Sequence, residues 1–308
     1  MKFTLIPRSV RKSRFAVLPV LAAAALTATL VAVPGARAAD TAAHVYVVTF
    51  SGEFGTVNLS NGVFRQIGPN TPESLGGLVW ANGTLYSLVT GGNNAGDLVT
   101  INPATGQVTD VGPTGLGADA FGLGGVDGHL YLTDFNVGGG VQNLYSVNLA
   151  TGAATLIGPT GVPADLVAPF TIINNSWIVL CDETITGVDG KLYVTYDEVS
   201  FDLNRQDSTY LNEKALIPAA LYEVDPTGAT AKIGPTLWND DGAAEVGGST
   251  YLFSVGIKAW TNKSGPLSAT QVLTVDLGSG DTTPVISDGT AVYVTQGEGV
   301  AGAAPVQP

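Results

Sequence analysis

Cysteine and histidine are scarce in this sequence, which has one cysteine and two histidines in 308 residues. A single cysteine, Cys181, cannot form an internal disulfide, so the fold has to be held together by packing and backbone pairing. We interpret Cys181 as a small buried hydrophobic residue rather than a nucleophile. Long apolar runs are also scarce, because after residue 38 none approaches the ~18 residues of a membrane span.

Basic residues are few relative to acidic ones. Lys and Arg number 13 against 26 Asp and Glu, and six of the 13 lie in the first 38 residues. The remainder carries seven bases and 26 acids, a net charge of −19. So acidic a surface repels phosphate backbones and anionic headgroups, which argues against nucleic acid and membrane surfaces as partners. It attracts divalent cations, or it keeps an exported protein in solution.

The first 38 residues resemble a secretory signal peptide. A basic start leads into an apolar run over 15–33, and Ala36-Arg37-Ala38 provides a small-residue cleavage site. A membrane anchor is the alternative, since the apolar run is about long enough to span a bilayer, but Pro19 and Pro34 and the cleavage site favour removal. We therefore expect a secreted, extracellular protein with no membrane span after cleavage. The sequence leaves its oligomeric state open.

One sequence unit recurs five times after the leader. Each copy has a segment that ends in a turn glycine, followed by a short strand that ends in Ile-Gly-Pro, Val-Gly-Pro or, more loosely, Val-Ile-Ser. The turn segments are 55–62, 98–106, 144–152, 221–228 and 273–280. A further strand precedes each turn segment, over 44–50, 84–89, 129–134, 191–196 and 250–255.

Four of these preceding strands are entered through a two-residue turn. The turns are Asn82-Gly83, Asp127-Gly128, Asp189-Gly190 and Gly247-Gly248. These residue pairs tolerate the positive φ angles of a type I′ hairpin. One more strand lies upstream of each turn, so the repeated unit has four antiparallel strands with two tight hairpins. Both faces of such a unit are apolar here and have to be covered by neighbouring units.

A unit of this kind is a propeller blade, and the strand count closes a ring. The first copy lacks its own first strand, while residues 291–297 remain unassigned near the C-terminus. We predict an all-β, five-bladed β-propeller over residues 39–297, closed by pairing of 291–297 with 44–50. A linear solenoid is the alternative, but it would leave the first blade without its inner strand. Residues 298–308 are predicted to form a flexible tail.

The Leu-Tyr, Thr-Gly and Ile-Gly-Pro elements of these copies occur, for example, at 85–86, 105–106 and 67–69. They resemble the degenerate blades of bacterial secreted propellers and are similar to quinoprotein-like and streptogramin-lyase-like repeats. The resemblance extends over residues 44–297 and implies a propeller fold. The tryptophan-docking pattern of the quinoproteins and the histidine constellation of the lyases have no match in this sequence. Neither activity therefore carries over.

Variation in length collects at one end of the predicted propeller. The turn glycines are spaced 44, 46, 76 and 52 residues apart, and nearly all the excess falls in connections opposite the tight hairpins. One insertion, 158–183, contains an added hairpin formed by 170–173 and 177–180. Two others, 197–218 and 257–269, hold four of the seven remaining bases, Arg205, Lys214, Lys258 and Lys263. This distribution predicts a ligand surface around blades 4 and 5, with ordinary polar, solvated loops as the alternative.

Acidic residues gather where the chain enters the inner strands. They lie 9 to 12 residues before the aligned Leu, or its equivalent, in the second strand of the blade that follows. These residues are Glu73, Asp119, Asp182, Glu183, Asp240 and Asp241. Carboxylates that face one opening bind Ca²⁺ or share protons with raised pKa values. No cofactor is demanded by the sequence, but calcium is the candidate, with Glu73, Asp119, Asp182 and Asp240 as ligands. Local hydrogen bonds in turns are the alternative.

The two histidines, His44 and His129, stand beside the tight hairpins and therefore away from the long loops. That position disfavours a Ser-His-acid triad or a histidine-ligated zinc at the predicted surface. Catalysis would then use carboxylates with Tyr, Lys or Arg. The catalytic candidates are Asp182, Glu183, Asp240, Asp241, Tyr210 and Lys214, and the candidate ligand contacts are Trp177, Asp197, Glu198, Arg205, Trp238 and Trp260.

Three functions remain open on the sequence alone. The first is an extracellular binding or interaction propeller for a glycan or protein ligand, with or without a divalent cation. The second is a carbohydrate-active hydrolase or lyase that uses the carboxylates at the channel mouth. The third is a structural protein without a small ligand.

Overall fold

The computed structural model describes residues 43–164, 172–173, 177–202, 214–227, 230–236, 240–255, 270–295 and 299–307. The predicted leader, 1–38, lies outside the described residues. The described part of the chain is almost entirely β-structure, with one short 3₁₀ helix, η1 (Gly117–Asp119). It contains no helix that is long and apolar enough to cross a membrane.

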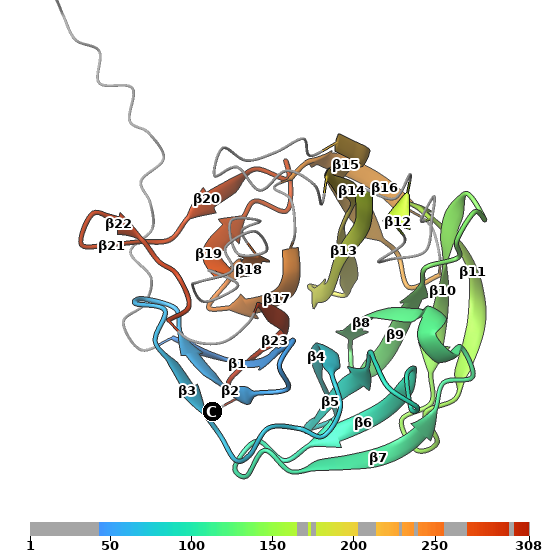
Figure 1. The fold of residues 1–308 in the computed structure, drawn as a ribbon, viewed down its shortest axis with the longest axis horizontal. Coiled ribbons are helices and arrows are strands. Elements are labelled where there is room, and N and C mark those ends of the chain that lie inside the picture. The colour runs from blue at the N-terminus through green and yellow to red at the C-terminus, as the bar shows by residue number, and fades with distance from the viewer. Residues whose placement is uncertain are drawn as a thin grey trace, which may run out of the picture. The chain divides into compact units, whose positions relative to one another are not determined.

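The strands form five antiparallel sheets arranged as a five-bladed β-propeller, with β23, β4, β8, β13 and β17 innermost (Figure 1). Blade 1 consists of β23 (Val300–Pro305), β1 (His44–Thr49), β2 (Phe54–Asn58) and β3 (Phe64–Gln66). Blade 2 consists of β4 (Leu75–Ala81), β5 (Thr84–Val89), β6 (Asp97–Ile101) and β7 (Val108–Pro113). Blade 3 consists of β8 (Ala120–Val126), β9 (His129–Asp134), β10 (Val141–Val147) and β11 (Ala154–Pro163).

Blade 4 consists of β13 (Trp177–Val188), β14 (Lys191–Asp202), β15 (Lys214–Val224) and β16 (Thr230–Pro235). A fifth, short strand, β12 (Ile172–Ile173), pairs with the start of β13 on the edge opposite β14. Blade 5 consists of β17 (Asp240–Val246), β18 (Ser249–Val255), β19 (Thr270–Val275) and β20 (Thr282–Pro284). A small hairpin of β21 (Ile286–Ser287) and β22 (Thr290–Ala291) follows blade 5. The five-bladed architecture and the four-strand unit predicted from the repeats are confirmed.

The tight hairpins also form as predicted. Asn82 and Gly83 have φ angles of 47° and 75°, and Asp127 and Gly128 have 51° and 78°. Positive φ at both central residues is the requirement of a type I′ turn, which matches the right-handed twist of the flanking strands. The inner and second strands of each of these blades are therefore joined in a fixed register.

The C-terminal strand closes the ring by pairing with blade 1, but it is not the predicted segment. β23 pairs antiparallel with β1, with Val45 opposite Pro305 and Tyr46 opposite Ala304. The predictions of 291–297 as the closing strand and of 298–308 as a flexible tail are therefore wrong. Crowding near the axis explains the choice: an ideal Cβ on Gly302 would lie 2.7 Å from the carbonyl carbon of Gly77 in β4. Gly302, which has no side chain, fits at this contact, whereas the bulky Val-Tyr-Val run within 291–297 would not.

The segment around Tyr293 instead packs on the outer part of blade 1. The Thr295 amide donates to the Gly62 carbonyl oxygen at 3.0 Å, and a bridge pairs Tyr293 with Gln271 of blade 5. Val292 and Val294 are buried in the cluster that joins blades 1 and 5. The segment therefore connects the first and last blades without entering the inner ladder.

The Ile-Gly-Pro and Thr-Gly elements of the repeat meet between neighbouring blades. A Cβ added to the glycine of Ile-Gly-Pro or Val-Gly-Pro would collide with the backbone of the turn in the next blade. The pairs are Gly68 with Thr105, Gly112 with Thr151 and Gly234 with Ser279. At Gly112 the added Cβ would lie 2.5 Å from the carbonyl oxygen, and φ is +141°. Glycine is required there because backbone packs on backbone. The repeated motif thus fixes the spacing of the blades.

Candidate functional site

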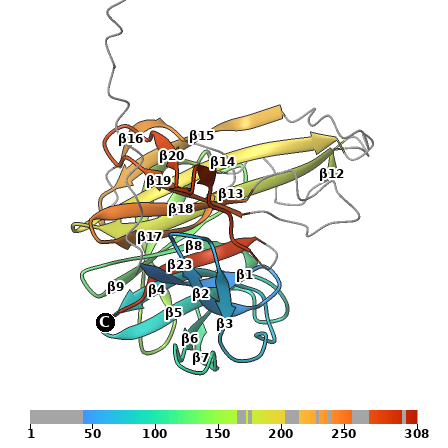
Figure 2. The same cartoon turned by 90° about the vertical axis from the view of Figure 1, so that its left-hand side faces the viewer.

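Blade 4 differs from the other blades in the length of its inner strands. β13 and β14 have 12 residues each, whereas β4, β8 and β17 have 7. Their ladder runs without interruption from Trp177 opposite Asp202 to Val188 opposite Lys191. Figure 2 shows both strands extending past those of the other blades toward β12. The blade therefore projects at the end that carries the long connections.

The added hairpin predicted in the insertion before blade 4 is present, since Ile172 pairs with Ile178. Its second arm continues directly into the inner strand, so Asp182 and Glu183 lie in the middle of β13 and not at the entry to it. Residues 197–202, predicted as part of a loop insertion, likewise continue β14. The long ladder pairs both segments, and this pairing outweighs the loop-like composition of the insertion.

The acidic residues of blade 4 occupy adjacent levels of this ladder. Asp182 is the backbone partner of Asp197, Glu183 is the partner of Tyr196, and Cys181 is the partner of Glu198. Successive side chains of a strand point to opposite faces, so Asp197 and Glu198 lie on different faces of β14. Both are buried, with exposed fractions of 2% and 0%. Two of the predicted ligand contacts are therefore interior groups in the chain as described.

Glu183 points into the junction between blades 3 and 4. Its carboxylate accepts hydrogen bonds from the Thr133 hydroxyl of β9 and, at 2.9 Å, from Nε2 of Gln142 in β10. Gly122 of β8 leaves the space for this carboxylate, because a Cβ there would overlap the Glu183 Oε1 atom. The two donors and the glycine come from three different strands of blade 3. The site is thus a buried carboxylate held by the neighbouring blade.

A second buried carboxylate lies in blade 3 itself. Asp134 accepts hydrogen bonds from the Asn143 amide at 2.7 Å, from Asn143 Nδ2 at 2.9 Å and from the Tyr145 hydroxyl at 2.8 Å. Burial, and then the hydrogen bond to Asp134, raise the pKa of Tyr145 to about 12. The buried acidic side chains among the described residues are Asp134, Glu183, Asp197 and Glu198, all of them in blades 3 and 4.

The other predicted site residues are dispersed or lie outside the described part. Glu73 belongs to the connection between β3 and β4 and accepts a hydrogen bond from Asn94 at 2.6 Å, while Asp119 ends η1 before blade 3. Arg205, Tyr210, Trp238 and Trp260, and the side chains of Trp177, Asp182, Lys214, Asp240 and Asp241, lie outside the described residues. Among the side chains that are described, no three His, Cys, Asp or Glu residues form a group that could hold a metal ion.

The inner strands approach one another closely near the axis. A Cβ on Gly187 of β13 would overlap the carbonyl oxygen of Gly125 in β8, and glycines in β4 and β23 meet in the same way. Backbone packs on backbone at these contacts, so no side chain fits between the two strands there.

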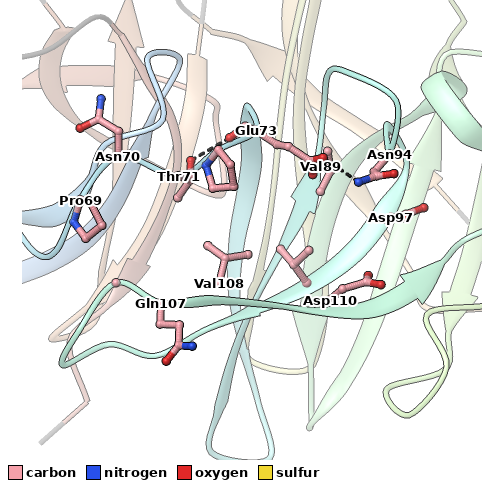
Figure 3. Close-up of a pocket in the computed structure, with 13 residues that line it drawn as sticks. Pro69, Asn70, Thr71, Glu73, Val89, Asn94, Asp97, Gln107, Val108 and Asp110 are labelled. Carbon is pink, nitrogen blue, oxygen red and sulfur yellow. Dashed lines mark hydrogen bonds between the residues drawn. The ribbon is translucent and has the colours of Figure 1, made fainter.

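Sequence reasoning missed a pocket of about 450 Å³ between blades 1 and 2 (Figure 3). Its wall includes Glu73, Asp97 and Asp110, and its apolar part includes Val89 and Val99. Glu73 alone was singled out from the sequence. The signal that could have identified the pocket is the valine at position 99, where the aligned strands of blades 3 and 4 carry tyrosine.

No protein-family model and no curated protein matches this chain. Among solved structures, a chain of the nidogen/laminin complex is 11% identical, with 86% of this chain and 98% of that chain covered and a TM-score of 0.45. Bacteroides ovatus xyloglucan PUL GH43B is 15% identical (83% and 55% covered, TM-score 0.44). The PQQ-bound aldose sugar dehydrogenase of Streptomyces coelicolor is 14% identical (69% and 62% covered, TM-score 0.39). Likenesses of this size transfer no activity to the present chain.

Proposed function

We propose that this chain is a secreted binding propeller that holds an extracellular glycan or protein ligand at the loop end of blades 4 and 5. The observation that carries the proposal is the 12-residue β13–β14 ladder, which projects at that end. Recognition residues are commonly placed on variable loops that a rigid sheet positions. The signal-like start of the sequence supports export.

The buried acids of blade 4 support the same location. By register, Glu183 occupies the inner-strand position that Val300 holds in blade 1 and Leu75 holds in blade 2. Burying a carboxylate costs free energy that an aliphatic residue at this position avoids. The propeller fold therefore does not require an acid there. Among the described side chains, buried carboxylates lie only in blades 3 and 4, which indicates a role beyond packing.

The insertions supply residues suited to such ligands. Aromatic rings stack on sugars, and Arg and Lys pair with carboxylates; the residues proposed for contact are Trp177, Asp197, Glu198, Arg205, Tyr210, Lys214, Trp238 and Trp260. Calcium is the proposed cofactor, because acidic oxygen ligands are numerous at the same end. Of the ligands predicted from the sequence, Asp182 and Asp240 lie in blades 4 and 5 and are the ones proposed for this site. Glu73 and Asp119 precede blades 2 and 3 and are not part of it.

The test is a binding screen of the chain from residue 39 against extracellular glycans and proteins, with Ca²⁺ and with a chelator. In one variant, an Asn-Gly turn replaces residues 201–213. Because Ser200 lies opposite Lys214 and a two-residue turn joins directly paired residues, the rest of the β14–β15 ladder can be retained. We expect the variant to lose binding and the control Asp127→Asn, at the tight-hairpin end, to keep it. Equal binding by all three proteins would exclude the blade 4 surface.

A carbohydrate-active hydrolase or lyase is the second candidate. It is favoured by one observation, the placement of Asp182 and Asp197 at the same level of neighbouring strands. Glycosidases use two carboxylates, one as acid and one as base or nucleophile. An Asp197→Asn variant should then lose turnover on a polysaccharide panel while keeping its melting temperature. For a binding protein, no turnover is measured with either form.

A further inference from the structure

We propose a second ligand site, independent of the blade 4 surface, in which the pocket between blades 1 and 2 binds an alkylammonium group, as carried by a free diamine or a lysine side chain. The pocket has a volume of about 450 Å³ and lies where the connection from β3 to β4 passes over β6 and β7 (Figure 3). It is open to solvent and lined by both apolar and acidic side chains.

The pocket exists because one repeat position is left unfilled. By register with the second strand of each blade, Val99 in β6 corresponds to Tyr145 in blade 3, Tyr222 in blade 4 and Leu273 in blade 5. In blade 1 the corresponding residue is Gly55, and there the ring of Phe64 covers the space. Blade 2 has neither a large side chain nor a neighbouring ring at this position. The volume that other blades fill is open in this blade.

The occupant of the same place in blade 3 indicates the chemistry that fits. The apolar ring of Tyr145 covers the sheet, and its hydroxyl donates a hydrogen bond of 2.8 Å to the Asp134 carboxylate. In blade 2 the apolar support is provided by the buried Val89 and Val99, and the acceptors are at the rim. A ligand with an apolar stem and a donor head matches this arrangement.

The charge of the rim selects a cation. Glu73, Asp97 and Asp110 line the pocket, and its lining contains no Lys, Arg or His. Partial burial, and then the charges of Asp110 and Glu73, raise the pKa of Asp97, so these carboxylates are close enough to repel one another. An ammonium group relieves that repulsion. A metal ion fits less well, since no three acidic side chains of the described residues form a metal-binding group.

The rim is held in place before any ligand binds. Asn94 Nδ2 donates to Glu73 Oε1 at 2.6 Å, and the Thr71 hydroxyl donates to the Glu73 carbonyl oxygen at 2.7 Å. Figure 3 shows Glu73 and Asn94 directed toward each other across the upper edge of the pocket. Preorganised groups lose less conformational entropy on binding, which favours affinity for a small ligand.

The experiment is a calorimetric titration of the chain from residue 39 with 1,5-diaminopentane and with a lysine-containing tripeptide at pH 7. The neutral analogues are 1-pentanol and the Nε-acetylated tripeptide. We expect saturable binding of at least one amine and none of its neutral analogue. Binding of the diamine alone identifies a free amine as the ligand source, and binding of the tripeptide identifies a lysine side chain.

Two variants and one control locate the binding. Val99→Tyr rebuilds the blade 3 arrangement and should abolish binding, and Asp97→Asn with Asp110→Asn should weaken it about tenfold, the size of one charge-assisted interaction. Asp288→Asn removes an exposed charge in the hairpin after blade 5 and should change nothing. Melting temperatures verify that each variant folds. The proposal is overturned if neither amine binds, or if both pocket variants bind as the parent does.

Discussion

Gln142 of blade 3 donates a hydrogen bond of 2.9 Å to Glu183 of blade 4, and both side chains are buried. The bond joins two sheets at the junction where the outer strand β11 is 10 residues long, against 3 to 6 in the other blades. The junction below the proposed ligand surface is thus held by polar contacts in addition to apolar packing.

Replacing Glu183 by leucine, as at position 75 in blade 2, is expected to destabilise the protein by about 2–4 kcal/mol, because Thr133 and Gln142 lose their buried acceptor. Glu183→Gln keeps one acceptor and should cost less. Urea unfolding of both variants measures the difference, with the half-buried Glu73→Gln as a control expected to shift stability by less than about 0.5 kcal/mol. A leucine variant as stable as the parent would show that the hydrogen bonds contribute no stability.

Gly112 tests the contact between the repeated motifs. Gly112→Ala should destabilise by about 2 kcal/mol or more, because its Cβ would lie 2.5 Å from the Thr151 carbonyl oxygen. Gly83→Ala is the matched control: it also has positive φ, but nothing lies within 4 Å of the added Cβ. Its cost should be about 1–2 kcal/mol, from φ alone. Thermal unfolding compares the two variants. An equal or smaller loss of stability for Gly112→Ala would show that this contact does not fix the spacing of the blades.

Tyr145 makes stability depend on alkaline pH. Burial, and then Asp134, raise its pKa from the usual value near 10 to about 12, so the folded state favours the neutral phenol. This contribution is fully present below the unfolded pKa of about 10 and is lost as pH rises through the folded pKa. Between about pH 10 and pH 12, the melting temperature of Tyr145→Phe should accordingly fall less steeply than that of the parent. The ultraviolet absorbance of tyrosinate follows the ionisation directly. Parallel curves would mean that Tyr145 does not titrate with an elevated pKa.

Turn chemistry made the blades predictable, whereas contacts between blades were not evident in the sequence. Asn82-Gly83 specifies its turn locally, because few other residue pairs adopt two positive φ angles in succession. Gly302, by contrast, lies against Gly77 of another blade, and no local sequence pattern reveals such a contact. A strand composed of Gly and Ala carries little intrinsic β propensity, so 291–297 was the stronger candidate on composition alone.

The candidate site was likewise predictable where it depends on local sequence and not where it depends on contacts between blades. Acids were expected where the chain enters the inner strands, and Asp119 and Glu73 do precede β8 and β4. Glu183 was expected at the same kind of entry, but the extended ladder of β13 and β14 places it inside a sheet. Its partners, Thr133 and Gln142, come from another blade and carry no sequence signal that connects them with position 183. The smaller residue that leaves the pocket open, Val99, can be recognised only when all five repeats are aligned by register.

Every placement of a functional residue depends on the ring being closed by β23, and truncation tests this closure most directly. A chain that ends at Gly299 lacks β23 but retains 291–297, while a chain that ends at Pro305 retains the whole strand. We predict that the shorter chain loses cooperative thermal unfolding and that the longer one melts as the parent does, because β1 loses its inner partner in the first case alone. An unchanged melting transition in the chain ending at Gly299 would contradict the closure and the arrangement of blades built on it.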